Sequence, residues 1–274
     1  MKPSLTCILA LLLLQTAKAA EPPDRAKLAQ AARKVDEIVG HRGSSVDRPE
    51  NTLASYRRAI EAKATAVEID VRTTKDGILV SLHDADLERV SNGKGRVGDR
   101  TLAELKQLDF GSRFDAKYKD ERIATVPEIL ALCRGKCEVL FDLKETGEAY
   151  TERIAAVVRE QGEAKRIMLG VRSVDQARAL RKLLPVCRQI GLIPEAKDIN
   201  AFAEAGVETI RLWPKWLEDS TLVPLVRKHK LRLHLGTGKG TPDEVIPLLA
   251  FEPESLSSDD PARLRQTLAE LAKE

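Results

Sequence analysis

Residues 39–84 read VGHRGSSVDRPENTLASYRRAIEAKATAVEIDVRTTKDGILVSLHD and contain three polar clusters, each at or near the end of an expected strand. His41 and Arg42 follow a short apolar run, Glu68 and Asp70 lie within VEIDV, and His83 follows ILVSL. Side chains alternate along a strand, so the two carboxylates share one face and the apolar residues of VEIDV share the other. The stretch therefore predicts strands whose polar residues gather into one site.

The residue types in this stretch suit one kind of chemistry. Two carboxylates that lie close together repel each other unless a cation or a proton lies between them. A bound divalent metal is the simplest reason for such a pair, and neighbouring histidines can move protons at neutral pH. An isolated Glu-x-Asp is more often a solvated strand face. The apolar strand and the flanking histidines favour the site here.

The rest of the chain alternates between expected strands and helices, which predicts a parallel barrel of the TIM type, (β/α)₈. The strand–turn–strand over 66–82 departs from strict alternation. Active sites of such barrels lie at the carboxyl ends of the strands. The expected strands are 38–40, 66–72, 78–82, 138–143, 166–171, 188–193, 208–212, 231–235 and 255–258, and the expected helices follow Pro49 and lie at 102–108, 128–134, 151–160, 174–184, 198–205, 220–229, 242–250 and around Leu264, Leu268 and Leu271.

The motifs HRG, PENT, ExD and HD stand in this order within about fifty residues, and together the chain resembles the glycerophosphodiester phosphodiesterase family. The likeness continues through VGDRTLAELKQLDFGSRF, FDLKE and SLSSDDPARL, and so covers most of the chain after residue 38. The resemblance implies metal-dependent hydrolysis of a glycerophosphodiester to glycerol 3-phosphate and an alcohol. In the family the attacking group can be the glycerol 2-hydroxyl, which gives a cyclic phosphate that water then opens.

Three carboxylates, Glu68, Asp70 and Asp142, form an oxygen-only ligand set that suits one hard divalent cation, Ca²⁺ or Mg²⁺. Zinc more often recruits cysteine or several histidines. The family more often has glutamate where Asp142 stands, and the shorter side chain places that metal contact in question. An ion pair of Asp142 with Lys144 on the barrel rim is the alternative.

The remaining roles concern phosphate and protons. We expect Arg42 and Lys144 to bind the phosphate oxygens, because a guanidinium offers two parallel hydrogen bonds to phosphate. We expect His41 and His83 to act as an acid–base pair. The residues alone do not distinguish the acid from the base, and we assign His41 as the acid and His83 as the base.

Several neighbouring residues are expected to support these groups. Glu50 and Asn51 would hold the loop near His41, and Asp84 would orient a partner. His234 or Trp213 could line the pocket for the alcohol, although a place in the core or on the rim fits them equally well.

The chain is expected to divide into a signal peptide at 1–19, a lead-in at 20–37 and a barrel domain at 38–274. Lys2, an apolar run over 7–14 and Ala-Lys-Ala at 17–19 fit a cleaved secretory signal and hence export to a periplasmic or extracellular space. An uncleaved anchor is the alternative, but the apolar run is short for a membrane span. The remaining chain of about 255 residues suits one barrel.

Charge and cysteine content limit the partners. The 45 basic and 42 acidic residues are nearly balanced, so nothing indicates a basic nucleic-acid footprint. We expect a small-molecule phosphodiester as the partner, which a membrane lipid could supply, and infer no protein partner. Export would permit a disulfide between Cys133 and Cys137, and with Cys187 the mature count is odd.

Two other functions compete with this hypothesis. A lysophospholipase D or a sphingomyelin-directed phosphodiesterase would use the same scaffold and need a long apolar groove. A non-catalytic barrel that binds phosphorylated ligands would need no histidine pair. Because both histidines and the Glu-x-Asp pair are present, the sequence favours an enzyme.

Overall fold

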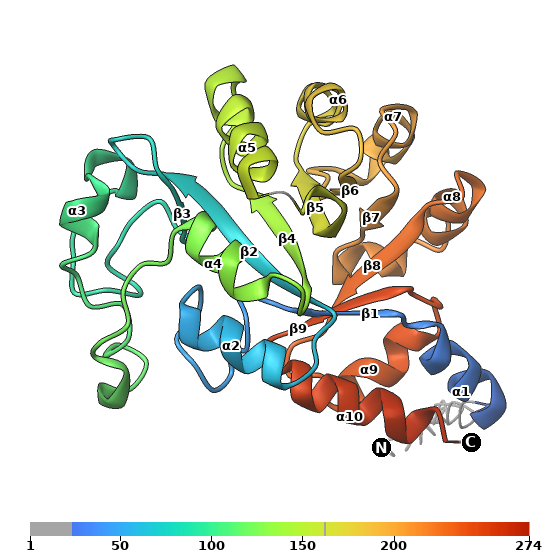
Figure 1. Cartoon of the computed structure of the whole chain (residues 1–274). Coiled ribbons are helices and arrows are strands. Elements are labelled where there is room, and N and C mark those ends of the chain that lie inside the picture. Colours follow the sequence, from blue (N-terminus) through green and yellow to red (C-terminus); the bar gives the residue numbers. More distant parts are fainter. Residues whose placement is uncertain (1–23, 162, 274) are drawn as a thin grey trace, which may run out of the picture.

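Parallel strands close into a barrel in the computed structural model, which describes residues 24–161 and 163–273 (Figure 1). The order around the barrel is β1-β9-β8-β7-β6-β5-β4-β2, and pairing of β1 with β2 closes it. The predicted TIM-type barrel is therefore confirmed. The barrel strands are β1 (Glu37–Gly40), β2 (Ala66–Thr73), β4 (Glu138–Leu143), β5 (Ile167–Val171), β6 (Arg188–Gly191), β7 (Thr209–Arg211), β8 (Arg232–Gly236) and β9 (Ser255–Ser258).

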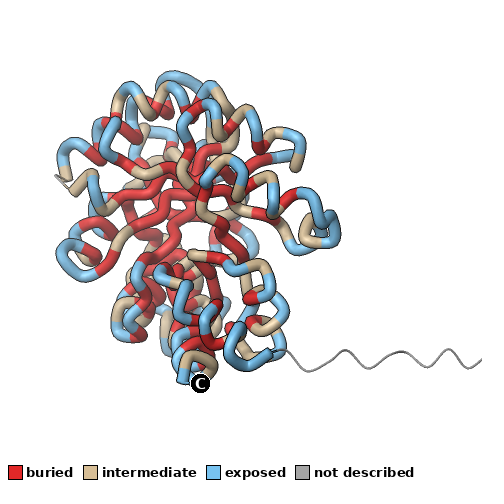
Figure 2. The backbone as a smooth tube through the Cα atoms, turned by 90° about the vertical axis from the view of Figure 1, so that its right-hand side faces the viewer, coloured by how far each residue is buried: buried red, intermediate tan, exposed pale blue. Residues whose placement is uncertain are grey.

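Helices surround the barrel and bury the outward face of its strands (Figures 1 and 2). Val67, Ile69 and Val71 of β2 belong to the large core between strands and helices, as their alternation with the carboxylates predicted. The helices in this layer are α2 (Leu53–Glu61), α4 (Val126–Cys133), α5 (Glu148–Gln161), α6 (Val174–Leu183), α7 (Ile199–Glu204), α8 (Leu222–Lys228), α9 (Pro242–Leu249) and α10 (Pro261–Leu271).

Several predicted helix ends differ from the structure; α5, for example, begins three residues before the expected 151. The helix expected to begin after Pro127 begins before it, at Val126, because Thr125 caps the helix and Pro127 lies in the first turn. Proline is tolerated there because the first backbone N–H groups of a helix need no intrahelical acceptor.

Inward-facing residues of the barrel form layers. At the amino ends of the strands, Arg188 pairs with Glu37 and Glu138. An apolar layer follows, and it consists of Val39, Ala66, Leu140, Met168, Ile190 and Leu192. Further along β2 and β4, the inward positions carry carboxylates. The apolar layer therefore supports the polar groups near the carboxyl ends from below.

The segment between β2 and α4 is more structured than the sequence predicted. Strand β3 (Leu79–Ser81) pairs antiparallel with β2, as the strand–turn–strand pattern indicated. For the residues that follow, the sequence predicted a short helix at 102–108. Around α3 (Leu102–Leu105) they also build a second hydrophobic cluster, which contains Val80, Leu82, Leu87, Val97, Leu105, Phe110 and Ile123. This packing fixes the chain that follows His83.

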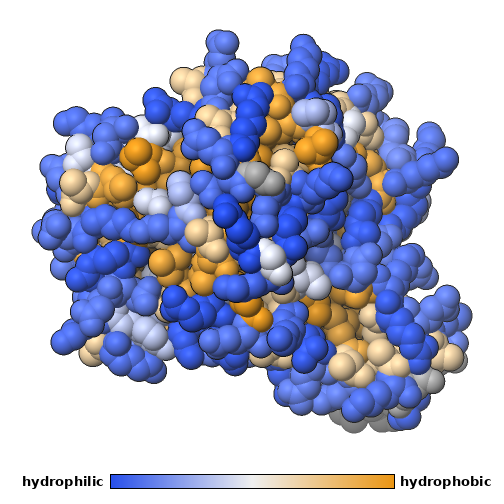
Figure 3. All heavy atoms as spheres, viewed as in Figure 1, coloured by the Kyte–Doolittle hydropathy of each residue, from blue (hydrophilic) through white to orange (hydrophobic). Residues whose placement is uncertain are grey.

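The two ends of the described chain lie side by side. Helix α1 (Arg25–Lys34) falls within the predicted lead-in and packs against α10 and α9 (Figure 1). The predicted signal peptide lies outside the described residues. Among the helices that are described, none is long and apolar enough to cross a membrane. The face of the molecule in Figure 3 is largely hydrophilic, with smaller hydrophobic patches.

The disulfide that the sequence permitted is not formed in this structure. Cys133, Cys137 and Cys187 are free thiols, and all three are buried.

Candidate active site

A cavity of about 550 Å³ opens where barrel strands end. Side chains from β1, β2, β4, β5 and β7 or the turns just after them reach it, and so does His83 after β3. Its lining consists of His41, Arg42, Arg72, His83, Asp142, Lys144, Arg172, Arg211 and Trp213. The structure therefore brings both predicted histidines and both predicted phosphate-binding residues to one place.

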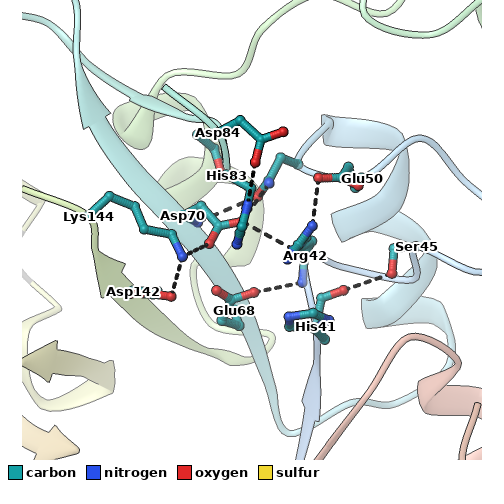
Figure 4. A network of polar contacts seen from close by, with 12 residues as sticks. His41, Arg42, Ser45, Glu50, Glu68, Asp70, His83, Asp84, Asp142 and Lys144 are labelled. Atoms are coloured by element: carbon teal, nitrogen blue, oxygen red, sulfur yellow. Dashed lines mark hydrogen bonds and ion pairs between the residues drawn. The ribbon is translucent and has the colours of Figure 1, made fainter. Parts of the chain in front are cut away.

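The three predicted metal ligands also lie together beside this cavity. Oxygen atoms of Glu68, Asp70 and Asp142 are all within 4.8 Å of one another, and the three side chains are buried (Figure 4). Their meeting follows from the sheet register, because Asp70 on β2 lies beside Asp142 on β4. Alternation places Glu68 on the same inward face two residues earlier.

The charges of this cluster are unevenly compensated. Burial and the charge of Asp70 raise the pKa of Glu68 to about 8. Burial acts in the same direction on Asp70, but Lys144 and Arg42 outweigh it and hold the Asp70 pKa at about 2. The Nζ atom of Lys144 lies 2.8 Å from Asp70 Oδ1 and 2.6 Å from Asp142 Oδ2. Glu68 is therefore the carboxylate that lacks a close cation.

The donor set fits a hard divalent cation, and its members differ in availability. Glu68 accepts a hydrogen bond of 2.8 Å from the backbone N–H of Arg42 through Oε2. Asp142 is more occupied, because Arg172 Nη2 donates to both of its oxygens at 2.6 and 2.8 Å. The ion pair between Asp142 and Lys144, which the sequence left as an alternative to metal binding, is also present. Both oxygens of Asp70 are held as well, by Lys144 and by Asn51, so Glu68 is the carboxylate with the fewest competing contacts.

Each histidine has one ring nitrogen held by a carboxylate. Nδ1 of His41 lies 2.7 Å from Asp259 Oδ1, and Nδ1 of His83 lies 2.8 Å from Asp84 Oδ1. Both arrangements leave Nε2 for the cavity. Burial lowers the pKa of His41, but its hydrogen bond to Asp259 and the charge of Glu68 outweigh burial, so the pKa is raised.

Burial has the larger effect on His83. It lowers the pKa of this histidine below its ordinary value, although the hydrogen bond to Asp84 acts in the opposite direction. The two histidines are therefore biased toward different protonation states. His41 favours the charged form more than His83 does.

The loop between β1 and α2 connects the histidine to the acidic cluster. Arg42 has a positive φ of 56°, which turns its backbone N–H toward Glu68. Its Nη1 donates to Glu50 Oε1 at 3.0 Å. Asn51, with φ of 58°, donates from Nδ2 to Asp70 Oδ2 at 2.7 Å and accepts from the Tyr56 hydroxyl. Glu50 and Asn51 thus lie where the sequence placed them, at the supports of the site.

Four neighbours of the site escaped the sequence reasoning. Asp259 directly follows β9, the neighbour of β1, and only the matching SLSSDD segment could have indicated it. Arg72 donates to the backbone carbonyl of His83. Arg172 and Arg211 follow or end strands that carry no motif. These contacts join different strands or the turns after them, and local patterns do not reveal such contacts.

Of the two candidates for the alcohol pocket, one reaches the cavity. Trp213 lines it, and the guanidinium carbon of Arg211 lies 4.2 Å from the Trp213 ring centroid. His234 is buried inside the barrel between Ser255 and Ser257. Burial and the charge of Arg211 lower its pKa well below the ordinary value. His234 thus belongs to the barrel interior.

Comparison with known proteins agrees with this geometry. Residues 41–235 match the model of the glycerophosphoryl diester phosphodiesterase family, which is more than half of the chain. The chain belongs to this family. The matched range contains every predicted site residue.

Individual family members are similar over parts of the chain. A glycerophosphodiester phosphodiesterase of Caldanaerobacter subterraneus is 36% identical over 160 residues, which are 57% of this chain and 65% of the relative. One from Bacillus subtilis is 29% identical over 72% of this chain and 74% of its own length. Human glycerophosphodiester phosphodiesterase 1 is 35% identical over 51% of this chain and 44% of its own length. The match thus spans less than two thirds of the length of several relatives.

Solved structures share the fold along most of the chain. A glycerophosphodiester phosphodiesterase from Agrobacterium tumefaciens superposes with a TM-score of 0.74 at 26% identity, covering 84% of this chain and 99% of that one. An Oleispira antarctica phosphodiesterase, solved with the product sn-glycerol-3-phosphate, has a TM-score of 0.78 at 24% identity and covers 87% of this chain and 99% of its own. At 24% identity, the similarity to the Oleispira antarctica structure shows a shared fold and nothing further.

Proposed function

We propose that this protein hydrolyses glycerophosphodiesters to glycerol 3-phosphate and an alcohol. The observation that carries the proposal is the meeting of Glu68, Asp70 and Asp142 beside a cavity that His41 and His83 line. Membership in the family and the names of the relatives support the reaction class.

The proposed proton transfers use the free nitrogen of each histidine. His83, whose pKa is lowered, accepts the proton of the attacking hydroxyl at Nε2. His41, whose pKa is raised, donates the proton of its Nε2 to the alcohol oxygen as the bond from phosphorus to that oxygen breaks. Asp84 and Asp259 hold the opposite ring nitrogens and so fix both orientations. The attacking hydroxyl is a water molecule, which gives glycerol 3-phosphate directly, or the glycerol 2-hydroxyl, which gives a cyclic phosphate that water then opens.

The proposed binding of the phosphate uses the cations around the carboxylates. Arg42 and Lys144 contact the acidic cluster and line the cavity, so both can meet phosphate oxygens there. A Ca²⁺ or Mg²⁺ ion held by Glu68, Asp70 and Asp142 would neutralise negative charge on the phosphate. The cavity lining is mainly charged. Among the described residues that line it, Trp213 is the one with a large apolar side chain. This lining favours a water-soluble diester over a lipid with a long acyl chain.

The test is release of glycerol 3-phosphate from glycerophosphocholine by the purified protein. It is run with EDTA, then with Ca²⁺ or Mg²⁺ restored. We expect activity that requires the cation, and a loss of about 10²- to 10⁴-fold in His83→Ala and in His41→Ala, the usual range for an acid–base group. We expect Glu68→Gln to lose the cation dependence together with the activity.

Two matched variants serve as controls. His229→Ala removes a histidine that contacts Asn200 on the surface, and Glu61→Gln removes an exposed carboxylate on α2. Both should keep full activity. Turnover that survives EDTA, or that survives loss of either cavity histidine in a folded variant, would contradict the proposal.

Export stays a separate proposal. We propose that residues 1–19 are removed during secretion, on the strength of the sequence pattern. Determination of the N-terminus of the protein recovered from its native cells tests this, and an intact Met1 would contradict it.

A further inference from the structure

We propose that Arg211 forms a second anion site in the cavity, and that the preferred substrates are glycerophosphodiesters whose alcohol carries a carboxylate or a phosphate. This inference rests on the proposed function, whose substrate class it narrows. It is carried by three observations: the position of Arg211, its missing partner and its immediate surroundings.

Arg211 faces the reacting centre from the opposite side of the barrel. Going around the closed sheet from β2, strand β7 is the fourth strand in either direction. Glu68 and Asp70 lie on β2, whereas Arg211 is the last residue of β7. Side chains from both sides of the barrel reach the same cavity. Asp142 of β4, the strand next to β2, and Arg211 of β7 both line it.

Arg211 lacks the compensation that the other cavity arginines have. Arg42 pairs with Glu50 and Arg172 pairs with Asp142, while Arg72 donates to the carbonyl of His83. Within the described residues, Arg211 has neither a hydrogen bond nor an ion pair, and its Nε is buried without a partner. An uncompensated guanidinium in a cavity is costly unless a ligand supplies the negative charge.

The surroundings hold the guanidinium in place but give it no hydrogen-bonded counterion within the described residues, since Glu68 and Asp142 act on it only through their charges. One side faces the ring of Trp213 at 4.2 Å from its centroid. On the β8 side, a Cβ added at Gly236 would lie 3.3 Å from Arg211 Nη2, so the glycine leaves room for the side chain. A planar guanidinium positioned in this way suits the two oxygens of a carboxylate or phosphate.

The reacting phosphate is not the group that Arg211 meets. Arg42 follows β1 and Lys144 follows β4, the two neighbours of β2, and both contact Asp70. The phosphate is thus bound at the β2 side. Arg211 meets what extends across the cavity, and glycerol carries no charge that would match it. The alcohol is the part of the substrate that can carry the second anion.

The experiment compares pairs of diesters that differ in one anionic group. Glycerophosphoserine and glycerophosphoethanolamine differ by a carboxylate, and glycerophosphoinositol 4-phosphate and glycerophosphoinositol differ by a phosphate. For the unaltered, Ca²⁺-loaded protein we expect kcat/KM to be at least roughly tenfold higher for the anionic member of at least one pair. A hydrogen bond between charged groups strengthens binding by about this factor. Which pair responds identifies the anion.

Variants then assign the preference to this residue. Arg211→Gln should abolish the preference, because it should lower kcat/KM more for the anionic diester than for its partner, mainly through KM. Arg211→Lys should restore part of the preference. Arg265→Gln, which alters an exposed arginine on α10, should change nothing. The comparison in the unaltered protein needs no variant and is decisive even where Arg211→Gln does not fold.

Several results would overturn the inference. Equal kcat/KM within both pairs would do so, as would a preference that persists in folded Arg211→Gln. Equal loss on all four diesters in that variant would place Arg211 at the reacting phosphate instead. If the unaltered protein hydrolyses none of them, the proposed function fails, and calorimetric binding of the same pairs decides the anion site: tighter binding of an anionic member supports it, and equal binding refutes it.

Discussion

At the scale of single residues, the two cavity histidines differ through their surroundings. Each has a carboxylate at Nδ1, yet the pKa of His41 is raised and that of His83 is lowered. Around His41 the hydrogen bond to Asp259 and the charge of Glu68 outweigh burial, whereas around His83 burial outweighs the hydrogen bond to Asp84 and the charge of Asp70. These neighbours support the assignment of acid and base, which the amino-acid sequence left open.

The pH profile of kcat/KM should separate the two roles. The acidic limb follows protonation of the base His83, and the alkaline limb follows deprotonation of the acid His41. Asp84→Asn removes a contact that raises the His83 pKa, so the acidic limb should move to lower pH. Asp259→Asn should move the alkaline limb to lower pH and narrow the profile. Exposed Asp86→Asn is the control, and exchange of the two limbs between the variants would reverse the assignment.

Lys144 is a residue whose loss should affect folding as well as activity. Its Nζ contacts Asp70 and Asp142, and all three side chains are largely buried. Removal of one partner of a buried ion pair leaves an uncompensated charge, so Lys144→Met should lower the free energy of unfolding by about 3 kcal/mol. Urea unfolding in EDTA measures it. Lys197→Met, at an exposed pair, should change it little, and equal effects would show that the buried pair is not stabilising.

At the scale of elements, the loop from β1 to α2 determines where His41 and Arg42 lie. Gly43 has a positive φ of 90°, and a Cβ there would lie 2.6 Å from the backbone carbon of Ser55 in α2. Ser55 also accepts the backbone N–H of Ser44 and donates to the carbonyl of Arg42. The loop is therefore packed directly onto the helix.

Gly43→Ala should separate this close approach from simple backbone strain. Gly95 also has a positive φ, of 81°, but a Cβ there would meet nothing within 4 Å. Gly95→Ala should therefore lower the free energy of unfolding by only about 1 kcal/mol, the cost of holding alanine in the left-handed conformation. Gly43→Ala should lower the free energy of unfolding by more than Gly95→Ala does. It should also lower kcat/KM by roughly 10²-fold, because a misplaced catalytic group has that effect. Thermal unfolding and diester hydrolysis measure the two, and similar behaviour of both variants would contradict the packing argument.

The elements also show what the sequence could and could not predict. Alternation in VEIDV placed Glu68 and Asp70 on one face because period-two patterns are local. Pairing of β2 with β4 then placed Asp142 beside them, as the βαβ pattern indicated. Asp259, Arg172 and Arg211 were missed because their contacts depend on side-chain directions after barrel closure. The second cluster around Phe110 was missed because its apolar residues follow no regular period.

At the scale of the whole molecule, the barrel separates structural from reactive groups along its axis. Arg188 with Glu37 and Glu138 occupies the amino ends of the strands, and the apolar layer around Leu140 and Met168 lies beyond it. The carboxylates come next and are held on this apolar support. Burial makes their mutual repulsion strong, so the stability of the whole barrel is linked to the site.

This linkage predicts how stability depends on pH without a bound cation. The pKa of Glu68 is about 8 in the folded protein against an ordinary value of 4.5. Between these values the folded state keeps a proton that the unfolded state has lost, so the contribution is complete below pH 4.5 and disappears as pH rises through about 8. Asp70, with a lowered pKa of about 2, acts in the opposite direction and only at more acidic pH.

Glu68→Gln should abolish this decline, because glutamine does not ionise. Urea unfolding of both proteins in EDTA, from about pH 5 to about pH 9, measures the difference. Exposed Glu61→Gln should retain the wild-type slope. Millimolar Ca²⁺ or Mg²⁺ at the alkaline end should stabilise the wild type more than Glu68→Gln, since a ligand that binds only the folded state shifts the unfolding equilibrium. Parallel pH slopes for wild type and Glu68→Gln would mean that the buried carboxylates do not repel each other, and the case for a cation between them would lose its physical basis.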